Sequence, residues 1–240
     1  MAIYVITGKP RHGKTYYLAT MIPSWLKQAK LDGFKLFSNL KINYEKLGYG
    51  SEIIGNIYEK ADRENPEKLL FYWRNIDTWN FMEKGTILVD EASRYFNARK
   101  WAMLSEETEI KLQQHGKQDL DIWATTQHYS RIDISMRILV ERFVDIQMIF
   151  GSPDNEKRIL PRVIQASEYY LEDMERMERM GKDWAEEKGI EPLWTEKKLV
   201  RKKYFRLYDT RQPVGSSLPM PLKHVERVCP DCGERKIIHV

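Results

Sequence analysis

The sequence predicts an α/β fold with a mainly parallel central sheet, flanking helices and a small C-terminal extension. Short apolar runs rich in β-branched residues alternate with segments compatible with helices, and this alternation favours a parallel sheet. The chain has 240 residues, of which 42% are hydrophobic and 31% are charged, so it can build one sizeable α/β core. The net charge of +4 is too small to indicate a polyanionic partner by itself.

The first predicted strand leads into a loop that contains two glycines. The apolar run at residues 3–6 precedes residues 8–15, which fit the phosphate-binding pattern G-x-x-x-x-G-K-[ST]. The glycines let the backbone curl so that its N–H groups, and the start of a helix at residues 14–30, face phosphate oxygens. We expect a nucleoside triphosphate to be bound by this loop and the residue after it: Gly8, Lys9, Pro10, Arg11, His12, Gly13, Lys14, Thr15 and Tyr16.

Two side chains at the end of this loop have separate predicted roles. Lys14 is expected to reach the β- and γ-phosphates. The Thr15 hydroxyl is expected to contact Mg²⁺, a hard cation that takes few protein oxygens and keeps most of its waters. The alternative is a surface loop with an unrelated lysine. The preceding strand and the following helix favour the phosphate loop, because the motif requires both.

Two acids end a later buried strand. A second strand is expected at residues 36–42, with Asn39 at a turn, and residues 45–85 are less regular. The apolar strand at residues 86–89 then ends in Asp90 and Glu91. Asp90 is the candidate magnesium ligand, and Glu91 is the candidate general base that polarises the attacking water. The alternative is a solvated acidic turn. This alternative is less favoured because the same chain contains a phosphate loop.

A third polar strand end supplies an amide. Residues 120–127 form a strand-like run that closes in Gln127, and ligands bind at the carboxyl ends of parallel strands. Gln127 is therefore expected to hydrogen-bond the γ-phosphate or the attacking water.

A helix is predicted at residues 106–114 and a further strand at residues 143–150.

The order of these motifs resembles a known family. Four stretches carry the resemblance: residues 8–15; residues 88–92 with Tyr95, Phe96 and Arg99; residues 114–116 leading to residues 121–122; and residues 126–127 followed by Ile132, Asp133 and Arg137. This ordered set resembles the zonular occludens toxin-like ATPases, which are relatives of filamentous-phage morphogenesis proteins and of FtsK/HerA-type DNA-pumping and packaging ATPases. Residues 208–210 also resemble that family's closing segment.

The resemblance implies a motor that hydrolyses ATP to move or export a viral genome. It implies a homo-oligomer, for which a ring is one arrangement, with DNA contacted through its backbone and a capsid or virion-assembly protein as a further partner. A neighbouring subunit would then supply an arginine to the transferring phosphoryl group. Arg137, Arg142 and Arg99 are the candidates, and a solvated or salt-bridged surface arginine is the alternative for each.

One departure from the family concerns the membrane. Many filamentous-phage relatives carry a membrane-spanning helix after the ATPase domain, but no stretch here approaches the roughly 20 consecutive apolar residues that a span needs. The N-terminus enters the first strand without the pattern of a secretory signal. We therefore expect a protein of the host cytoplasm, with virion association left open, and no fusion to an export pore.

Three regions are predicted along the chain: an ATPase core at residues 1–164, a region at residues 165–212 that completes the core or contacts a subunit, and a tail at residues 213–240. Residues 167–188 are expected to form a polar helix with a methionine stripe, which is packing surface or a ring contact. The basic run at residues 197–206 is either a strip that contacts DNA phosphates or an edge strand whose lysines prevent unwanted pairing. Its aromatic residues, Tyr204 and Phe205, could stack on bases only if the DNA were single-stranded.

The tail holds both cysteines of the chain. Cys229 and Cys232 form a Cys-x-x-Cys knuckle suited to Zn²⁺, and His224 and His239 flank it as candidates for the remaining ligands. Ligands shared between two subunits and an unmetallated tail are the alternatives. A redox pair is less favoured, because no thioredoxin-like βαβ pattern surrounds it.

Together these observations predict an ATP-driven DNA translocase for viral genome packaging or virion morphogenesis. The rival hypothesis is a nucleotide-gated assembly or scaffold protein that hydrolyses slowly and moves nothing. A small-molecule phosphotransferase is disfavoured, because the acids at residues 90–91 and the polar residues at 126–127 resemble water activation more than acceptor binding.

Overall fold

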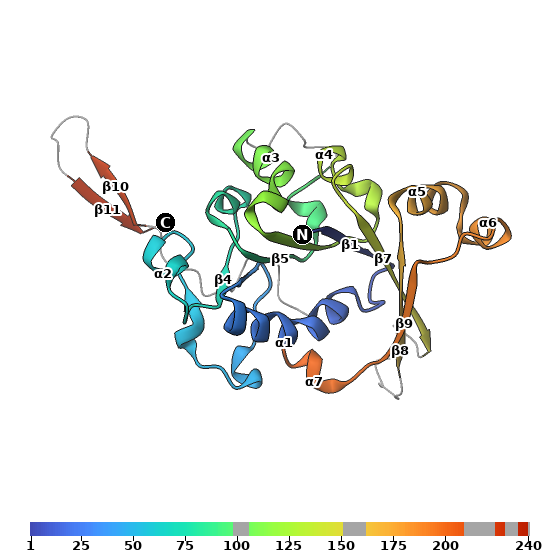
Figure 1. Ribbon diagram of the computed structural model, residues 1–240, viewed down its shortest axis with the longest axis horizontal. Coiled ribbons are helices and arrows are strands. Elements are labelled where there is room, and N and C mark those ends of the chain that lie inside the picture. The colour runs from blue at the N-terminus through green and yellow to red at the C-terminus, as the bar shows by residue number, and fades with distance from the viewer. Residues whose placement is uncertain (98–105, 151–161, 209–223, 229–234, 240) are drawn as a thin grey trace.

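A nine-stranded sheet forms the centre of the protein (Figure 1). The computed structural model describes residues 1–97, 106–150, 162–208, 224–228 and 235–239. The strand order is β3-β4-β2-β5-β6-β1-β7-β8-β9. The strands are β1 (Ile3–Thr7), β2 (Lys35–Ser38), β3 (Ile54–Gly55), β4 (Leu70–Tyr72), β5 (Gly85–Val89), β6 (Leu120–Thr125), β7 (Arg142–Phe150), β8 (Val163–Tyr169) and β9 (Trp194–Leu199).

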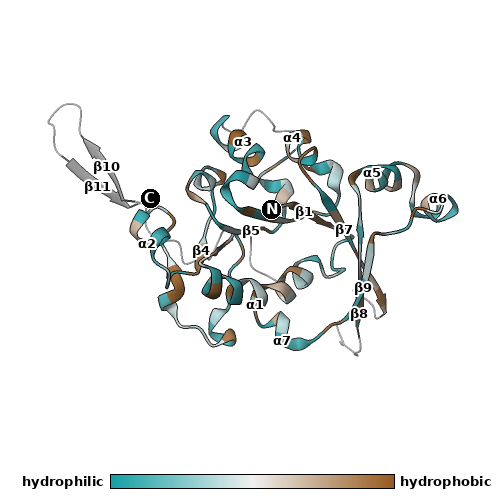
Figure 2. Ribbon diagram, viewed as in Figure 1, coloured by the Kyte–Doolittle hydropathy of each residue, from teal (hydrophilic) through white to brown (hydrophobic). Residues whose placement is uncertain are grey.

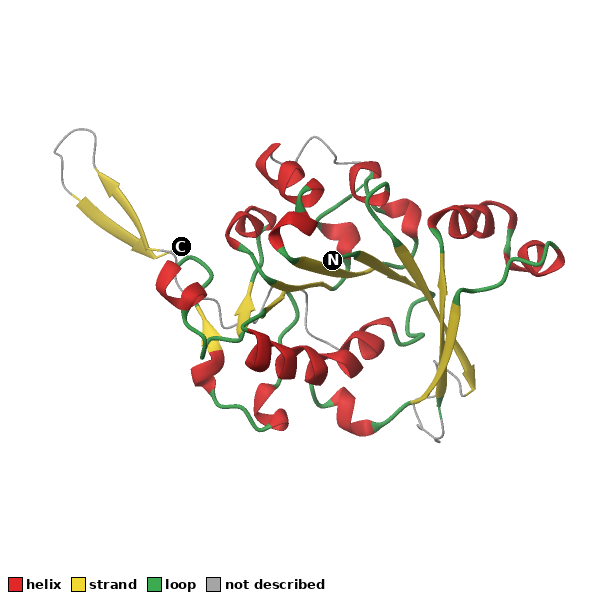
Figure 3. Cartoon of the chain, in the orientation of Figure 1, coloured by secondary structure: helices red, strands yellow, loops and turns green. Residues whose placement is uncertain are grey.

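The sheet is parallel from β3 to β7 and becomes antiparallel only at β8 and β9. The predicted α/β fold with a mainly parallel sheet is therefore confirmed. A separate antiparallel pair, β10 (His224–Val228) and β11 (Arg235–His239), lies in the C-terminal region. Figure 3 shows the strands in yellow and the helices in red.

Helices cover both faces of the sheet. They are α1 (Lys14–Asp32), α2 (Lys60–Glu64), α3 (Glu106–Gln113), α4 (Ile134–Arg137), α5 (Leu171–Met180), α6 (Lys182–Glu187) and α7 (Lys202–Phe205). Helices α1 and α7 lie on one side, and α3 and α4 lie on the other (Figure 1). The helices predicted at residues 14–30 and 106–114 correspond to α1 and α3.

The alternation of side chains along β1 separates two apolar layers. Ile3 and Val5 belong to the cluster that also contains Met174 and Met177 of α5. Ile6 belongs to the cluster beneath α1. Successive side chains of a strand point to opposite faces, so one short apolar strand contributes to both layers. In Figure 2 the central strands β1 and β7 are brown along much of their length, as expected for strands buried on both faces.

The predicted helix at residues 167–188 is partly wrong. Residues 163–169 form β8, which pairs with β7, so the boundary predicted after residue 164 falls inside this strand. The remainder is divided into α5 and α6 by Gly181, whose φ of 92° is a conformation that favours glycine. The predicted helical spacing of the apolar residues is therefore correct only from residue 170, which directly precedes α5. Met174 and Met177 are buried against the sheet, which confirms packing as the role of this part of the stripe.

The basic run is divided between two elements. Its first three residues end β9, which is the edge strand of the sheet, as the edge-strand alternative predicts. Residues 202–205 form α7, where Tyr204 and Phe205 contact the ring of Tyr16 at centroid distances of 5.9 and 5.0 Å. The aromatic residues of the run therefore pack against the helix that follows the phosphate loop.

Candidate functional site

Three polar strand ends meet at one edge of the sheet. Strand β6 lies between β1 and β5, and all three are parallel. The phosphate loop follows β1, Asp90 and Glu91 follow β5, and Gln127 follows β6 by two residues. The carboxyl ends of parallel strands lie at the same edge, so the topology brings the three predicted elements together.

The first glycine of the loop is required by a close approach of the backbone to β7. Gly8 has a φ of 142°, and a Cβ built on it would clash with the backbone oxygen of Ile146. Gly13, which precedes α1, has a φ of 99°. A Cβ built on Gly13 would lie 3.2 Å from Cγ2 of Ile164. Both positions lie in the left-handed region that favours glycine, so the loop depends on these two residues.

Lys14 is folded back onto the loop. Its Nζ donates hydrogen bonds to the carbonyl oxygens of Gly8 (2.8 Å) and Lys9 (3.0 Å). Burial lowers the pKa of Lys14, while the carboxylates of Asp90 and Glu91 act in the opposite direction. The ammonium group therefore lies against the start of the loop, where we expect phosphate oxygens to meet it.

Thr15 and Asp90 are in direct contact. The Thr15 hydroxyl donates to Oδ1 of Asp90 at 3.1 Å, and the Thr125 hydroxyl donates to the same oxygen at 2.7 Å. Burial raises the pKa of Asp90, and the two hydroxyl hydrogen bonds oppose this change. The hydroxyl and carboxylate oxygens beside the phosphate loop fit Mg²⁺, which takes one or two carboxylates together with substrate phosphates.

Glu91 lies at the turn that follows β5. Its φ of 54° and ψ of 54° place a residue other than glycine in the left-handed conformation. The side chain is 56% exposed, and its Oε2 lies 3.9 Å from Nη1 of Arg94. The carboxylate therefore remains accessible to solvent at the edge where the loop ends.

Two side chains that support this turn were not predicted as site residues. Asn39 follows β2, and its amide forms two hydrogen bonds of 2.8 Å with the backbone of Asp90. Thr125 ends β6, and its hydroxyl accepts a hydrogen bond from the backbone N–H of Glu91 at 3.0 Å. The sequence predicts only a turn at Asn39. The sequence signal is limited to a polar residue directly after an apolar run, because only the order of the strands in the sheet shows that this run lies beside the Asp90 strand.

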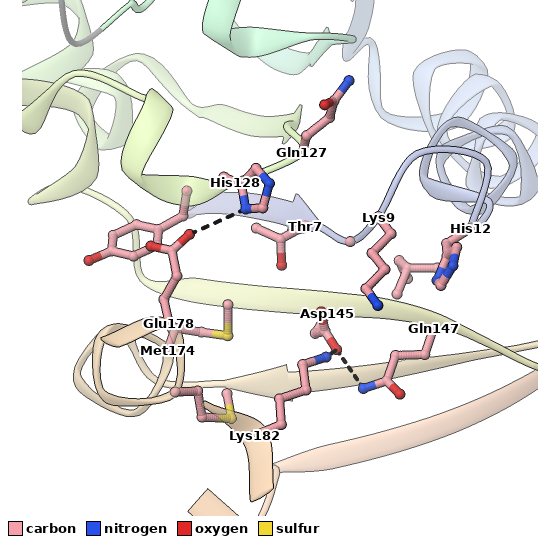
Figure 4. Close-up of a pocket in the computed structure, with 14 residues that line it drawn as sticks. Thr7, Lys9, His12, Gln127, His128, Asp145, Gln147, Met174, Glu178 and Lys182 are labelled. Atoms are coloured by element: carbon pink, nitrogen blue, oxygen red, sulfur yellow. Dashed lines mark hydrogen bonds and ion pairs between the residues drawn. The ribbon is translucent and has the colours of Figure 1, made fainter. Parts of the chain in front are cut away.

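Gln127 lies on the other side of the loop, at a cavity of about 290 Å³. The cavity is lined by residues from the end of β1 and the phosphate loop, the segment after β6, strand β7, helix α5 and the start of α6: Thr7, Gly8, Lys9, His12, Gln127, His128, Tyr129, Asp145, Ile146, Gln147, Met174, Met177, Glu178 and Lys182. Figure 4 shows Asp145 between Lys182 and Gln147. Asp145 forms an ion pair with Lys182 and accepts a hydrogen bond from Nε2 of Gln147 at 2.9 Å.

The two arginine candidates that the structure describes, Arg137 and Arg142, contact other residues of their own chain. Arg142 lies opposite Tyr4 in the sheet register, its Nε is 3.3 Å from Oε1 of Glu168, and its guanidinium lies 4.7 Å from the centroid of Tyr170. Arg137 lies over the ring of Tyr129 at 5.3 Å. Arg99 lies outside the described residues. Neither Arg137 nor Arg142 lies among the residues that meet at the phosphate loop.

The predicted zinc ligands are only partly covered by the structure. Cys229 and Cys232 lie outside the described residues, whereas His224 and His239 are register partners in the β10–β11 pair. Within the described ranges there is no group of three or more His, Cys, Asp or Glu residues that could hold a metal ion. Zinc binding by the tail stays a prediction.

Comparison with known proteins identifies the family. The family model described as Zonular occludens toxin (Zot) matches residues 2–156, which is more than half of the chain. The chain belongs to the zonular occludens toxin family. The resemblance inferred from the order of the motifs is therefore confirmed, and the matched region contains the phosphate loop, the Asp90 strand and Gln127.

Two relatives of this family member are phage proteins. The chain is 25% identical over 147 residues to the Gene 1 protein of Escherichia phage If1, covering 60% of the chain and 40% of the relative. It is 30% identical over 112 residues to the Gene 1 protein of Salmonella phage IKe, covering 46% of the chain and 30% of the relative. The matches thus span less than half the length of either phage protein.

Solved structures with a similar arrangement include the N-terminal domain of zonular occludens toxin from Neisseria meningitidis. That likeness has a TM-score of 0.47 at 22% identity and covers 87% of this chain and 98% of the other. The genome packaging NTPase of Sulfolobus turreted icosahedral virus 2, in complex with ATP-gammaS, has a TM-score of 0.47 at 13% identity, with 72% of this chain and 94% of the other covered. None of the helices that the structure describes in this Zot family member is long and apolar enough to cross a membrane.

Proposed function

We propose that this Zot family member is an ATPase that uses hydrolysis to move DNA during phage genome packaging or virion morphogenesis. The observation that carries the proposal is the assembly at one sheet edge of Lys14, the contact between Thr15 and Asp90, and the exposed carboxylate of Glu91. This set contains a phosphate-binding cation, oxygen ligands suited to Mg²⁺ and a base, which are the parts that hydrolysis of a phosphoanhydride needs.

Each residue has a distinct role in the proposed reaction. The loop N–H groups and Lys14 bind the β- and γ-phosphates, and Thr15 and Asp90 would hold Mg²⁺, which supplies positive charge to the phosphate oxygens when bound. Glu91 accepts a proton from the attacking water. Gln127, from the next strand, hydrogen-bonds the γ-phosphate or that water. The products are ADP and inorganic phosphate.

The proposed assembly is a homo-oligomer in which a neighbouring copy contributes an arginine. Arg137 and Arg142 are the candidates within the described residues, and Arg99 is the third. Arg137 is the better of the two described candidates, because Arg142 is already neutralised by Glu168 at 3.3 Å. Activity in the host cytoplasm, with a capsid or virion-assembly protein as partner, completes the proposal.

The proposed DNA contact is the exposed part of the basic run. Lys197, Arg201, Lys202, Lys203 and Arg206 are exposed. Lys198 is engaged within the chain, because its Nζ lies 2.9 Å from Glu196 and 4.6 Å from the centroid of Tyr17. Exposed lysines and arginines bind phosphates without sequence preference and with strong dependence on salt. We therefore propose contact with the DNA backbone rather than with bases.

ATP hydrolysis measured without DNA, with single-stranded DNA and with duplex DNA tests this proposal. Stimulation by one form of DNA is expected, and it should weaken as salt increases. Replacing Lys197, Lys202 and Lys203 together by alanine should reduce the stimulation, whereas the same change at the exposed Lys27, Lys30 and Lys46 should preserve it. Slow turnover that no DNA alters would favour the nucleotide-gated scaffold instead.

A further inference from the structure

At the end of β2, the side chain of Asn39 forms the hydrogen bonds to the residue after β5 that a backbone peptide would otherwise form. This side chain is completely buried. Ser38 is the last residue of β2 that is in register with β5, where it lies opposite Leu88. Beyond it, Nδ2 of Asn39 donates to the carbonyl oxygen of Asp90 and Oδ1 accepts from the N–H of Asp90, each at 2.8 Å. A side-chain amide thus replaces a backbone peptide as the partner of Asp90.

The peptide group that joins Asp90 to Glu91 is held on both sides. Its carbonyl accepts the hydrogen bond from Asn39, and its N–H donates to Oγ1 of Thr125 at 3.0 Å. The orientation of this peptide plane helps to set the φ of Glu91, which is 54°. Residues other than glycine populate this conformation only when their surroundings enforce it. Side chains from β2 and β6 supply that enforcement.

Thr125 connects this peptide to the proposed magnesium ligand. The same hydroxyl that accepts from the N–H of Glu91 donates to Oδ1 of Asp90 at 2.7 Å. Its donor and acceptor capacities are therefore both used at the site. The carboxylate of Asp90 and the backbone of Glu91 are fixed relative to each other by one hydroxyl group.

We propose that Asn39 and Thr125 are positioning residues, which fix the peptide plane between Asp90 and Glu91 and so aim the Glu91 carboxylate at the attacking water. This inference rests on the proposed ATP hydrolysis. Neither side chain would contact the water or the transferring phosphoryl group. Their effect is therefore expected on the rate of hydrolysis rather than on the affinity for nucleotide, because a small misplacement of a reacting group lowers the rate without removing binding contacts.

Ser38 provides a matched control for a purely structural role. It is also completely buried, it directly precedes Asn39, and its hydroxyl likewise forms two hydrogen bonds with one residue, Leu40. Those bonds do not involve Asp90 or Glu91. Ser38→Ala therefore removes a comparable pair of buried hydrogen bonds from the same strand end without releasing the peptide plane.

The test compares kcat, nucleotide affinity and thermal stability for Asn39→Leu, Thr125→Val and Ser38→Ala. We expect Asn39→Leu and Thr125→Val to lower kcat by about 10- to 100-fold, with the Kd for ATP within about threefold of wild type. Ser38→Ala should keep kcat within about twofold even where it lowers the melting temperature. Thr125→Ser keeps the hydroxyl, so it should recover most of the turnover that Thr125→Val loses.

Hydrogen exchange gives a readout that does not depend on activity. Asn39→Leu should speed exchange of the amides of Asp90 and Glu91, and Ser38→Ala should leave them protected. Unchanged kcat in Asn39→Leu, or a parallel loss of kcat and stability in all three variants, would overturn the inference while wild-type hydrolysis stands. A wild-type protein that hydrolyses no ATP would overturn the proposed function, and the positioning role with it.

Discussion

The polar groups on the two sides of the phosphate loop differ in whether they have hydrogen-bond partners. The β5 side contains Asp90 and Glu91, and the α5 side contains Gln127 and the cavity beside it. On the β5 side, the carboxylate of Asp90 accepts hydrogen bonds from Thr15 and Thr125, and Asn39 occupies its backbone groups. On the α5 side, polar groups surround a cavity of about 290 Å³. There, the buried Oγ1 of Thr7 has no hydrogen-bond partner among the described residues.

This difference separates preformed from incomplete parts of the site. Networks whose members all have partners hold a fixed geometry, whereas an unpaired buried hydroxyl leaves a hydrogen bond for another group to make. The hydrogen bonds on the β5 side therefore hold Asp90, the proposed magnesium ligand, in a fixed geometry. On the α5 side, which contains Gln127, the Thr7 hydroxyl lacks a partner among the described residues, although Asp145 is paired with Lys182 and Gln147.

The largest effect is expected from Lys14→Ala. This change removes the ammonium group that lies between the two sides and contacts both Gly8 and Lys9. Loss of a charged phosphate ligand should reduce ATP binding or turnover by at least about 100-fold. Equilibrium binding of a fluorescent ATP analogue measures the loss. Lys60→Ala, which removes an exposed lysine 3.5 Å from Glu64, is the control and should bind ATP normally.

A change at Gly8 tests whether the loop is fixed by its approach to β7. Gly8→Ala introduces a Cβ that clashes with the oxygen of Ile146 at a φ of 142°. We expect a loss of roughly 2–4 kcal/mol in the free energy of unfolding, together with weaker ATP binding. Gly48→Ala also places alanine at a positive φ but meets no atom within 4 Å, so it should lose only about 1–2 kcal/mol. Urea denaturation compares the two variants, and equal losses would contradict a specific role for the contact with β7.

The ion pair on the α5 side offers a smaller effect. Lys182→Met leaves Asp145, whose side chain is 7% exposed, without its cation. We expect a loss of about 1–3 kcal/mol in the free energy of unfolding, below the range for fully buried pairs because Lys182 is half exposed. Lys60→Met, which disrupts the exposed pair with Glu64, should change stability by less than about 1 kcal/mol. If both variants unfolded at the same urea concentration, the α5 side would not depend on this ion pair.

The smallest effect concerns pH and His12. Burial lowers the pKa of His12, and the nearby charges of Lys9 and Lys14 lower it further. The unfolded chain therefore binds this proton more readily, so the contribution of His12 to stability is present above about pH 6.5 and is lost as the pH falls through the folded pKa. Wild type should lose more stability than His12→Gln between pH 7.5 and 5.5 in urea denaturation. Parallel losses would show that His12 does not titrate differently in the folded state.

Short sequence patterns predicted the residues proposed to bind and hydrolyse nucleotide. The side chains that hold those residues in place depend on strand pairing between distant parts of the chain. The phosphate loop and the acids at residues 90–91 are visible in sequence because each depends on a few adjacent residues. The hydrogen bonds of Asn39 join positions 51 residues apart, so they depend on the order of β2, β5 and β6 in the sheet. The same reason explains the missed start of β8, whose antiparallel pairing with β7 overrides a local preference for helix.

Retention of unhydrolysed ATP by Glu91→Gln tests the central claim most directly. The variant and wild type are incubated with ATP and Mg²⁺, freed of unbound nucleotide and analysed for bound ATP and ADP. Glu172→Gln is the control, because Glu172 is an exposed acid that also lies 3.9 Å from an arginine. The account predicts bound ATP in Glu91→Gln, and ADP with released phosphate in wild type and Glu172→Gln. Hydrolysis by Glu91→Gln at the wild-type rate would contradict it.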